Sequence, residues 1–442
     1  MKKILLIGNG AREHVMAETL KNSRHGVELF AVGKTKNPGI ADLCEEYMLA
    51  DVCDEDSIRE FANRVRPDMA VIGPEAPIAE GITDMLLENG IKSASPLASV
   101  GRLETSKSFA RDLLTKYKIP GNPKYKVFFN EDGLSDIFDE LGDDFVVKAD
   151  GLKGGKGVKV SGDHLNGKEE GMNYARECLE EAGRVVIEEK LVGQEFSLMC
   201  FCDGQSISAM PCVQDHKRAY EGDKGPNTGG MGSYSAPDHL LPFLSNKDVN
   251  EAFYINERVL EAIYKETDAH FKGVMYGGFI LTKNGVKLIE YNARFGDPEV
   301  MNVLPLLKTD FVDVCDAIIN DSLDELELEF EHKATVCKYV VPEGYPDNPV
   351  KNEQVNVSEE ILTNEPGLKL YYASVDERDD GLYLAGSRAL AFVGIAETIE
   401  EAEAKAQKAV ESVKGPVFFR KDIGTRELID SKIEMMNKIR GV

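Results

Sequence analysis

The most constraining feature of the sequence is a segment rich in glycine and lysine between two apolar runs that predict β-strands. Residues 147–158 read VKADGLKGGKGV, with four glycines and three lysines. They do not form a Walker A loop, because Gly157 stands where Ser or Thr is needed and because a strand, not a helix, follows. The segment predicts a hairpin that folds over the phosphates of a nucleotide. Its positive charges are Lys148, Lys153 and Lys156.

The chain has a formal net charge of −25, which restricts its partners. Nucleic acids and anionic membranes attract basic proteins, so we expect neither as a partner. A phosphate-bearing substrate would need local cations and backbone N–H groups. No apolar stretch approaches the length of a membrane span, and the apolar start is too short for a signal peptide, so we expect a cytoplasmic protein. The eight cysteines include no C-x-x-C pair and are typical of buried free thiols.

The order of the predicted elements indicates several domains, of α/β and α+β class. A chain of 442 residues is too long for one core. The first hundred or so residues alternate strand and helix like a parallel α/β domain. Short strands with glycine turns follow from residue 125, and a third region begins near residue 331. We predict strands at 4–7, 29–32, 69–72, 145–148, 158–160, 185–188, 196–201, 278–282, 287–291, 334–341 and 389–395, and helices through 14–20, 58–65 and 399–413, with another beginning at 104–107.

A GNG turn at residues 8–10 follows the first strand and precedes a helix, as in a dinucleotide-binding fingerprint. Two features weigh against a dinucleotide: Glu13 stands at the third glycine position, and the second strand ends at residues 33–34 without an acid for a ribose hydroxyl. Backbone N–H groups, the helix dipole and the guanidinium of Arg12 suit a phosphate monoester. The alternative is a tight turn beside a surface arginine.

Polar residues gather at other strand ends and in two loops. Glu75 follows the strand 69–72, at the edge where an open α/β sheet binds ligands, and is suited to sugar hydroxyls. An acid at the end of the strand 185–188 is suited to an adenine edge, and Glu195 to the ribose, although charged strand ends are usually only solvated. The loops 214–218 and 226–232 are too polar and glycine-rich for packing, so they predict active-site loops.

Glu290 and Asn292 end a predicted strand two residues apart, so their side chains share one face of it. Carboxylate and amide oxygens suit Mg²⁺ that bridges nucleotide phosphates. Arg294 follows and is suited to neutralising a phosphoryl group in transfer.

In this order, the motifs resemble those of the ATP-grasp enzymes, and the specific set is similar to the phosphoribosylamine–glycine ligase family. The resemblance covers essentially the whole chain. Its blocks are GNGAREH at 8–14, GPEAP at 73–77, KADGLKGGKGV at 148–158, QDHKR at 214–218, GPNTGGMG at 225–232, EYNARFGDPE at 290–299 and FRKDIG at 419–424.

The resemblance implies three domains. They are an N-terminal parallel α/β domain at 1–105, an ATP-grasp core at 106–330 with a lid subdomain at about 121–194, and a small C-terminal α/β domain at 331–442. Many ATP-grasp enzymes carry a further metal-binding acid on the strand before the metal motif. Here that strand contains Gly277, Gly278 and Phe279 instead, so Glu290 and Asn292 would be the side-chain ligands.

The resemblance also implies an activity. The chain would be an ATP-dependent carbon–nitrogen ligase of purine biosynthesis that joins glycine to phosphoribosylamine through glycyl phosphate, with Mg²⁺ or Mn²⁺ as cofactor. We expect catalytic roles for Lys156, Arg294 and Asp215, the last paired with the ammonium of glycine. The expected ATP-binding residues are Lys107, Lys148, Gly154, Gly155, Lys156, Glu188, Glu189, Leu191 and Glu195. The expected substrate-binding residues are Gly8, Asn9, Gly10, Arg12, Glu75, Asp215, Lys217, Asn227, Thr228, Gly229, Gly230 and Arg294, and the metal ligands are Glu290 and Asn292.

Three alternatives keep part of this pattern. Another ATP-grasp carboxylate–amine ligase would share the nucleotide motifs and use a different acceptor. A nicotinamide-dependent dehydrogenase would use the GNG turn, and a non-catalytic module would bind the nucleotide only. We expect a monomer whose partners are the small molecules ATP, glycine and phosphoribosylamine.

Overall fold

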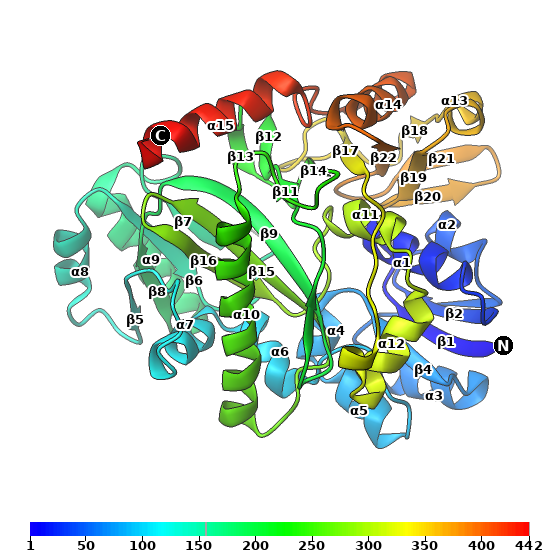
Figure 1. Cartoon of the computed structure of the whole chain (residues 1–442), viewed down its shortest axis with the longest axis horizontal. Helices are drawn as coiled ribbons and strands as arrows, with labels where there is room; N and C mark the ends of the chain where they lie inside the picture. The colour runs from blue at the N-terminus through cyan, green and yellow to red at the C-terminus, as the bar shows by residue number, and fades with distance from the viewer. Residues whose placement is uncertain (155–156, 442) are drawn as a thin grey trace.

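The structure is a computed structural model that describes residues 1–154 and 157–441. Its N-terminal part is a four-stranded parallel sheet in the order β3-β2-β1-β4, at the lower right of Figure 1. Ile4 and Leu6 pack against α1, whereas Leu5 and Ile7 pack against α3 and α5 on the other face. Burial on both faces explains the continuous apolar run of the first strand, and the predicted parallel α/β domain is confirmed. The elements are β1 (Lys2–Ile7), α1 (Ala11–Lys21), β2 (Val27–Gly33), α2 (Pro38–Ala41), β3 (Glu46–Leu49), α3 (Glu55–Val65), β4 (Met69–Ile72), α4 (Glu75–Ala79) and α5 (Ile82–Glu88).

Two helices lead from this sheet into the rest of the chain. α6 (Ala98–Thr105) ends where α7 (Lys107–Lys116) begins, and the Ser106 side chain caps α7 by accepting a hydrogen bond from the Phe109 N–H. The helix start predicted at 104–107 is confirmed, but a second helix ends at the same point.

The next segment forms a separate lobe, at the left of Figure 1, which we call the lid lobe (residues 121–192). It is an antiparallel sheet in the order β5-β8-β6-β7, covered by two helices. Phe128, Phe138, Phe145 and Ile187 belong to a hydrophobic cluster made only of residues of this lobe. The elements are β5 (Tyr125–Phe128), α8 (Leu134–Leu141), β6 (Phe145–Ala149), β7 (Val158–Val160), α9 (Gly167–Ala182) and β8 (Val185–Glu189).

The central sheet is antiparallel, in the order β10-β9-β15-β16. Its two middle strands are longer than predicted, and in β15 Gly277 and Gly278 lie inside the strand rather than at its start. The pairing of β15 with β16 shifts between Gly278 and Phe279, which skips Ile289 and turns the end of β16. The elements are β9 (Gly193–Cys202), β10 (Ile207–Ala209), α10 (Asn246–Thr267), β15 (Gly273–Thr282) and β16 (Gly285–Asn292).

A further sheet joins the core to the C-terminal region. Its order is β11-β14-β17-β22-β19, with β23 paired to β17. β11 and β14 flank the predicted active-site loops, so these loops and the C-terminal strands share one sheet. The elements here are β11 (Gln214–Asp215), β12 (Arg218–Tyr220), β13 (Lys224–Asn227), β14 (Gly232–Ser235), β17 (Ala334–Pro342), β19 (Leu368–Tyr372), β22 (Leu390–Ala396) and β23 (Val417–Phe418).

Helices and a small antiparallel sheet complete the C-terminal region, at the upper right of Figure 1, and α15 runs back along the top toward the lid lobe. The face predicted for the helix at 399–413 is confirmed, with Ala402, Ala406 and Ala409 fully buried. The remaining elements are α11 (Val300–Val303), η1 (Leu304–Leu306), α12 (Phe311–Asn320), η2 (Leu323–Glu325), β18 (Gln354–Val355), α13 (Glu359–Asn364), β20 (Val375–Arg378), β21 (Gly381–Leu384), α14 (Ile399–Ser412) and α15 (Arg426–Arg440).

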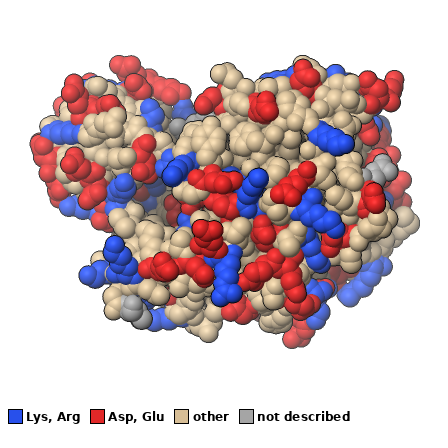
Figure 2. Space-filling view, turned by 90° about the horizontal axis from the view of Figure 1, so that it is seen from above, with Lys and Arg blue, Asp and Glu red and all other residues tan. Residues whose placement is uncertain are grey.

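Acidic and basic side chains are interspersed over the face drawn in Figure 2, with no broad basic patch on it. Within the described chain, no helix is both long and apolar enough to cross a membrane.

Candidate active site

The lysine-rich segment joins β6 to β7, as the sequence predicts. Gly154 lies in an exposed turn with φ +55°, a conformation that favours glycine. The predicted ligands Gly155 and Lys156 lie outside the described residues. Lys148, on β6, is only 5% exposed, and its Nζ donates to the Ile289 carbonyl at 2.9 Å. The ammonium of Lys148 therefore lies where the lid lobe meets the central sheet.

Glu188 is part of a buried ion-pair triad rather than a solvated strand end. Its carboxylate is 2.8 Å from Lys148 Nζ and 2.6 Å from Arg111 Nε. Burial alone would raise the pKa of Glu188, but the charges of Arg111 and Lys148 lower it. This corrects the expectation of a strand-end acid open to an adenine edge, because both carboxylate oxygens already bind protein cations. Among the neighbouring predicted ligands, Glu189 and Leu191 are half-buried and Glu195 is exposed.

Asp150 fastens the start of the lysine-rich segment to the N-terminus of α7. Its Oδ1 accepts the Lys107 N–H, and its Oδ2 lies 2.8 Å from Arg184 Nε. The Nζ of Lys107 in turn donates to the Gly151 carbonyl at 2.9 Å. The predicted ATP ligand Lys107 and the lysine-rich segment therefore meet, although the two are far apart in the sequence.

The two predicted metal ligands end β16 beside several cations. Lys217 Nζ is 3.3 Å from the Glu290 carboxylate, and the Asn292 Oδ1 accepts a hydrogen bond from Arg294 at 3.3 Å. Lys217 lowers the pKa of Glu290 to about 2 against the effect of burial, with help from Lys148 and Lys107. An ionised carboxylate and an amide oxygen are suitable ligands for a hard divalent cation. These two side chains can hold such an ion.

Asp215 has a buried carboxylate oxygen, Oδ1, that has no hydrogen-bond partner among the described residues. Burial and the nearby Glu299 raise the pKa of Asp215 well above its ordinary value, whereas Lys217 and Arg388 oppose the rise. Glu299 is buried and accepts a hydrogen bond from the Tyr276 hydroxyl at 2.8 Å. A buried carboxylate with a free acceptor is an incomplete arrangement, which a ligand cation would complete.

The glycine-rich loop at 226–232 is held against the strand that carries Asp215. Thr228 donates to the Lys217 carbonyl from its N–H at 2.7 Å and from its hydroxyl at 2.8 Å. The Gly229 N–H donates to the Tyr345 hydroxyl, and a β-carbon on Gly230 would lie 2.8 Å from Asp215 Oδ1. Asn227 is half-buried at the end of β13. The structure thus brings together the residues predicted from these two loops.

The GNG turn encloses a side chain of its own helix. A β-carbon at Gly8, Gly10 or Gly73 would collide with Glu13, whose carboxylate accepts the Gly10 N–H in a capping box. The expectation of an open phosphate site at this turn is corrected to this extent, because Glu13 already takes up part of the helix terminus. Asn9 faces the neighbouring turn, where its Oδ1 accepts the Lys34 N–H.

Two guanidinium groups converge on Glu75 at the start of α4. Arg294 lies 3.3 Å and Arg12 lies 4.0 Å from its carboxylate. Arg294 also pairs with Glu104 at 2.8 Å, and Arg12 with Glu13 at 2.7 Å. Burial would raise the pKa of Glu75, but Arg294 and Arg12 lower it to about 2. Both arginines remain charged and join the N-terminal domain to the end of β16.

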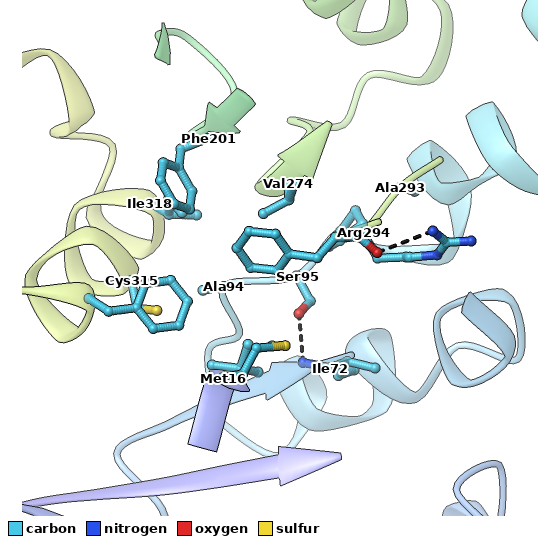
Figure 3. A pocket seen from close by; sticks show the side chains of 14 residues that line it. Met16, Ile72, Ala94, Ser95, Phe201, Val274, Ala293, Arg294, Cys315 and Ile318 are labelled. Atoms are coloured by element: carbon cyan, nitrogen blue, oxygen red, sulfur yellow. Dashed lines mark hydrogen bonds between the residues drawn. The ribbon is translucent and has the colours of Figure 1, made fainter. Parts of the chain in front are cut away.

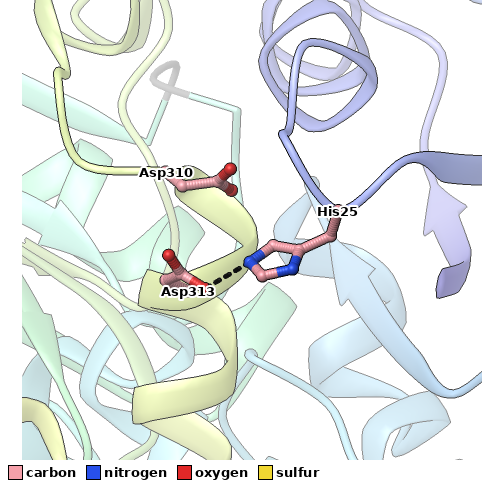
Figure 4. A group of neighbouring side chains, drawn as sticks. All are labelled: His25, Asp310 and Asp313. Atoms are coloured by element: carbon pink, nitrogen blue, oxygen red, sulfur yellow. Dashed lines mark hydrogen bonds and ion pairs between the residues drawn. The ribbon is translucent and has the colours of Figure 1, made fainter. Parts of the chain in front are cut away.

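Two other features do not belong to the site. An internal cavity of about 10 Å³ beside Arg294 is lined mainly by apolar side chains and has room for about one water molecule (Figure 3). His25, Asp310 and Asp313 lie close enough to hold a cation (Figure 4). However, His25 Nε2 is hydrogen-bonded to Asp313 at 2.6 Å, and Asp310 accepts from Ser23 and caps α12. These contacts explain the cluster as a junction between the N-terminal domain and α12.

Sequence reasoning missed several residues that support the site. Arg111 and Glu104 lie in ordinary helical sequence, and Asp150 lies in the lysine-rich segment but without an assigned role, so no spacing marks their pairing with distant residues. Glu299 was within the EYNARFGDPE block but without an assigned role. Arg388 was in no block at all.

Comparisons with known proteins extend over the whole chain. Models of the phosphoribosylglycinamide synthetase N domain, ATP-grasp (A) domain and C domain match residues 2–104, 105–300 and 335–426. A phosphoribosylamine–glycine ligase of Methanocaldococcus jannaschii is 53% identical over 446 residues, covering 99% of this chain and 100% of that protein. The protein of the same name in Methanosarcina acetivorans is 48% identical over 440 residues, covering 99% and 98%.

Solved structures agree in fold. A crystal structure of phosphoribosylamine–glycine ligase from Thermotoga maritima has a TM-score of 0.78 and 28% identity, covering 95% of this chain and 100% of that chain. The biotin carboxylase domain of the Hydrogenobacter thermophilus 2-oxoglutarate carboxylase has a TM-score of 0.71 at 15% identity, covering 99% and 94%, which is a likeness of fold alone.

Proposed function

The chain belongs to the phosphoribosylglycinamide synthetase family, and from this premise we propose how its side chains join glycine to phosphoribosylamine at the expense of ATP. The product is glycinamide ribonucleotide, an intermediate of purine biosynthesis. This membership excludes a nicotinamide-dependent dehydrogenase. It also disfavours an ATP-grasp ligase with a different acceptor, since the likeness to the ligase relatives runs through the acceptor loops as well as the nucleotide motifs.

The reaction has to activate a carboxylate, because oxide is an impossible leaving group. Transfer of the γ-phosphoryl group breaks its bond to ADP and forms a bond to a glycine carboxylate oxygen, giving glycyl phosphate. The amine of phosphoribosylamine then attacks the carbonyl carbon and loses a proton, and inorganic phosphate leaves with that oxygen. The site must supply charge for the phosphoryl group and exclude water from the acyl phosphate.

For the nucleotide, the proposal rests on the cations that surround Glu290. Lys107, Lys148 and Lys217 lie at the meeting of the lid lobe and the central sheet, as a nucleotide held under a lid requires. ATP-grasp enzymes use ATP and a divalent metal ion; we assign Glu290 and Asn292 to Mg²⁺ or Mn²⁺, which supplies charge neutralisation at the phosphates. We keep the remaining nucleotide assignments, Gly154, Gly155, Lys156, Glu189, Leu191 and Glu195, with Glu188 positioning Lys148.

For glycine, the observation that carries the proposal is the unpaired Oδ1 of Asp215 next to the cations that flank the metal ligands. A carboxylate there holds the ammonium group of glycine and leaves the glycine carboxylate toward Lys217 and the phosphoryl group. The loop with Asn227, Thr228, Gly229 and Gly230 forms the adjoining wall.

For phosphoribosylamine, the proposal assigns the surface around Glu75. Arg12 contacts the phosphate beside the turn of Gly8, Asn9 and Gly10, in which Glu13 already accepts the Gly10 N–H, and Glu75 accepts hydrogen bonds from sugar hydroxyls. Arg294 lies between this surface and Asn292, where it is placed to stabilise the acyl phosphate. All three substrates are thus served by residues of one chain, so we propose a monomer as the acting unit. We propose domain limits at 1–105, 106–330 and 331–442, with the lid at about 121–194.

An isotope experiment tests the acyl-phosphate step. With heavy oxygen in both carboxylate positions of glycine, one labelled oxygen should appear in the released phosphate and the other in the amide of the product. The oxygen that bonds to phosphorus leaves with it, which is why the label divides. Mass spectrometry of the phosphate decides the matter, with labelled inorganic phosphate incubated under the same conditions as the control for exchange with solvent. Unlabelled phosphate would show that the enzyme activates the amine or the sugar instead.

A further inference from the structure

Arg388 reaches from the C-terminal region into the wall of the proposed glycine site. It lies between β21 and β22, outside the part of the chain that matches the ATP-grasp model. Its Nη1 donates to the carbonyls of Gly229 at 2.6 Å, Gly230 at 3.1 Å and Asp297 at 3.1 Å. Its Nη2 is 2.8 Å from the Asp297 carboxylate. One guanidinium therefore ties together two loops that are far apart in the sequence.

The guanidinium is itself held in place. It lies over the Tyr339 ring, 4.3 Å from the centroid, and the Tyr339 hydroxyl donates to the other oxygen of Asp297 at 2.6 Å. The side chain of Arg388 is 14% exposed. A planar, always charged group with several fixed donors suits this bridge, and a lysine ammonium does not reproduce it.

The two loops that Arg388 joins both lie near Asp215. A β-carbon on Gly230 would be 2.8 Å from Asp215 Oδ1 and 2.6 Å from Pro298 Cδ, so these backbones pass very close to each other. Glu299, two residues after Asp297, raises the pKa of Asp215, and the charge of Arg388 opposes that rise. A shift of either loop would change the space and the charge at the unpaired oxygen.

We propose that Arg388 is a positioning residue through which the C-terminal domain builds the wall of the glycine site. The inference rests on the proposed function, in which Asp215 binds the ammonium of glycine. Arg388 does not touch the substrate. It fixes the distance between the 229–230 backbone and Asp297, and thereby the shape of the pocket around Asp215.

A plain ion pair without a role at the site is the competing explanation, and the C-terminal region contains an example of one. Arg378, on β20, is 2.9 Å from Asp376, donates to Asn352 at 2.8 Å and lies 4.1 Å over the Tyr383 ring. Like Arg388, it pairs with a carboxylate and lies over a tyrosine ring, but its other partner is a side chain rather than the backbone of the proposed glycine site. It also lies at the surface, with its side chain 40% exposed. Arg378→Ala is therefore the control for loss of a stacked, paired arginine in the same domain.

The experiment measures KM for glycine, ATP and phosphoribosylamine in the full-length enzyme. We expect Arg388→Ala to raise KM for glycine by about 10-fold or more, with KM for ATP within about twofold of the wild type, because several charge-assisted contacts are lost at one site only. The KM for glycine of Arg388→Lys should lie between those of the wild type and Arg388→Ala. The KM for glycine of Arg378→Ala should match that of the wild type. Added guanidinium ion should lower KM for glycine in Arg388→Ala and leave Arg378→Ala unchanged.

An unchanged KM for glycine, or an equal rise in KM for ATP, overturns the inference. If Arg388→Ala does not fold, Arg388→Lys and Asp297→Asn carry the same comparison. Asp215→Asn distinguishes a wrong role for Arg388 from a wrong glycine site. If Asp215→Asn raises KM for glycine and the Arg388 variants do not, the positioning role is wrong and the glycine site stands. If Asp215→Asn leaves KM for glycine unchanged, the assignment of the glycine site itself is wrong.

Discussion

Asp215 shows how burial can prepare a single side chain for a ligand. A carboxylate without a partner is costly in a protein interior, and the cost appears as a raised pKa. An ammonium ion removes that cost because it supplies both charge and hydrogen bonds. The carboxylate of Asp215 therefore protonates more readily than usual, and in the proposed function the ammonium group of glycine stabilises its ionised form.

This leads to a prediction about pH. As the pH falls toward the raised pKa of Asp215, the carboxyl group takes up a proton and can no longer pair with an ammonium, so KM for glycine should rise while KM for ATP changes little. Asp215→Asn should raise KM for glycine by about 10-fold or more and should remove the pH dependence. Steady-state kinetics across mildly acidic pH measure this, with the exposed Asp238→Asn as control. A wild-type KM for glycine that does not change with pH contradicts the role of Asp215.

Residue identities were easier to predict than residue partners. Charge and glycine content pointed to Lys148, Glu290 and Asp215 because those residue types are unusual in their local sequence. The sequence could not show that Glu188 binds Lys148 and Arg111, since the three come from different elements. Arg388 gave no signal because its partners are mostly backbone carbonyls, which any sequence supplies.

Asp150 shows how one element positions another. The N–H groups at the start of a helix lack partners within the helix, and a carboxylate placed there satisfies them. Here the carboxylate comes from the lysine-rich segment of the lid lobe, and the helix is α7. The same contact therefore completes a helix and fixes the point at which the segment begins.

Asp150→Ala should lower the free energy of unfolding by about 1–3 kcal/mol, because it removes a buried acceptor from α7 and leaves Arg184 without its partner. KM for ATP should also rise severalfold, since Lys107 and the segment lose their common anchor. Asp54→Ala is the matched control, because Asp54 caps α3 far from the site; it should leave KM for ATP unchanged. Thermal unfolding and steady-state kinetics of both variants test this. An unchanged KM for ATP in Asp150→Ala would leave Asp150 with a role in stability only.

Most strands and the helices at 14–20, 58–65 and 399–413 were predictable, because the periodicity of apolar residues indicates which side chains are buried. β4 and β7 have the predicted limits, whereas β15 begins five residues earlier than predicted. Gly277 and Gly278 lie inside this strand, where β-carbons would meet Phe279 and Glu290. The sharing of one sheet by β14 and β17 could not be predicted, because strand pairing at that separation leaves no local pattern.

On the scale of the whole molecule, the C-terminal region is packed against the other domains through buried polar residues as well as apolar ones. His14 of α1 stacks on Tyr372, and its Nδ1 accepts the Tyr372 N–H at 2.9 Å. His216 of the core lies near Asp223, Arg420 and Asp422, which connect the β12–β13 turn to the C-terminal segment. Both histidines therefore lie at contacts between domains.

These two histidines predict how the stability of the whole chain depends on pH. Burial lowers the pKa of both His14 and His216 from 6.5 to about 4. Between these values the unfolded chain binds more protons than the folded one, so the free energy of unfolding falls as the pH decreases from about 6.5 to about 4. The expected loss is at most about 3 kcal/mol per histidine, and it is complete once the folded protein also protonates.

Urea unfolding at several pH values measures this loss. Carboxyl groups titrate in part of the same range. The comparison is therefore between the slopes of unfolding free energy against pH for the wild type and for the His14→Gln, His216→Gln double variant. The double variant should show a shallower dependence of the unfolding free energy on pH, whatever its absolute stability. His332→Gln, at an exposed position, is the control and should keep the wild-type slope. Equal slopes for the wild type and the double variant would contradict the prediction. They would mean that His14 and His216 accept a proton without penalty in the folded protein, although both are buried.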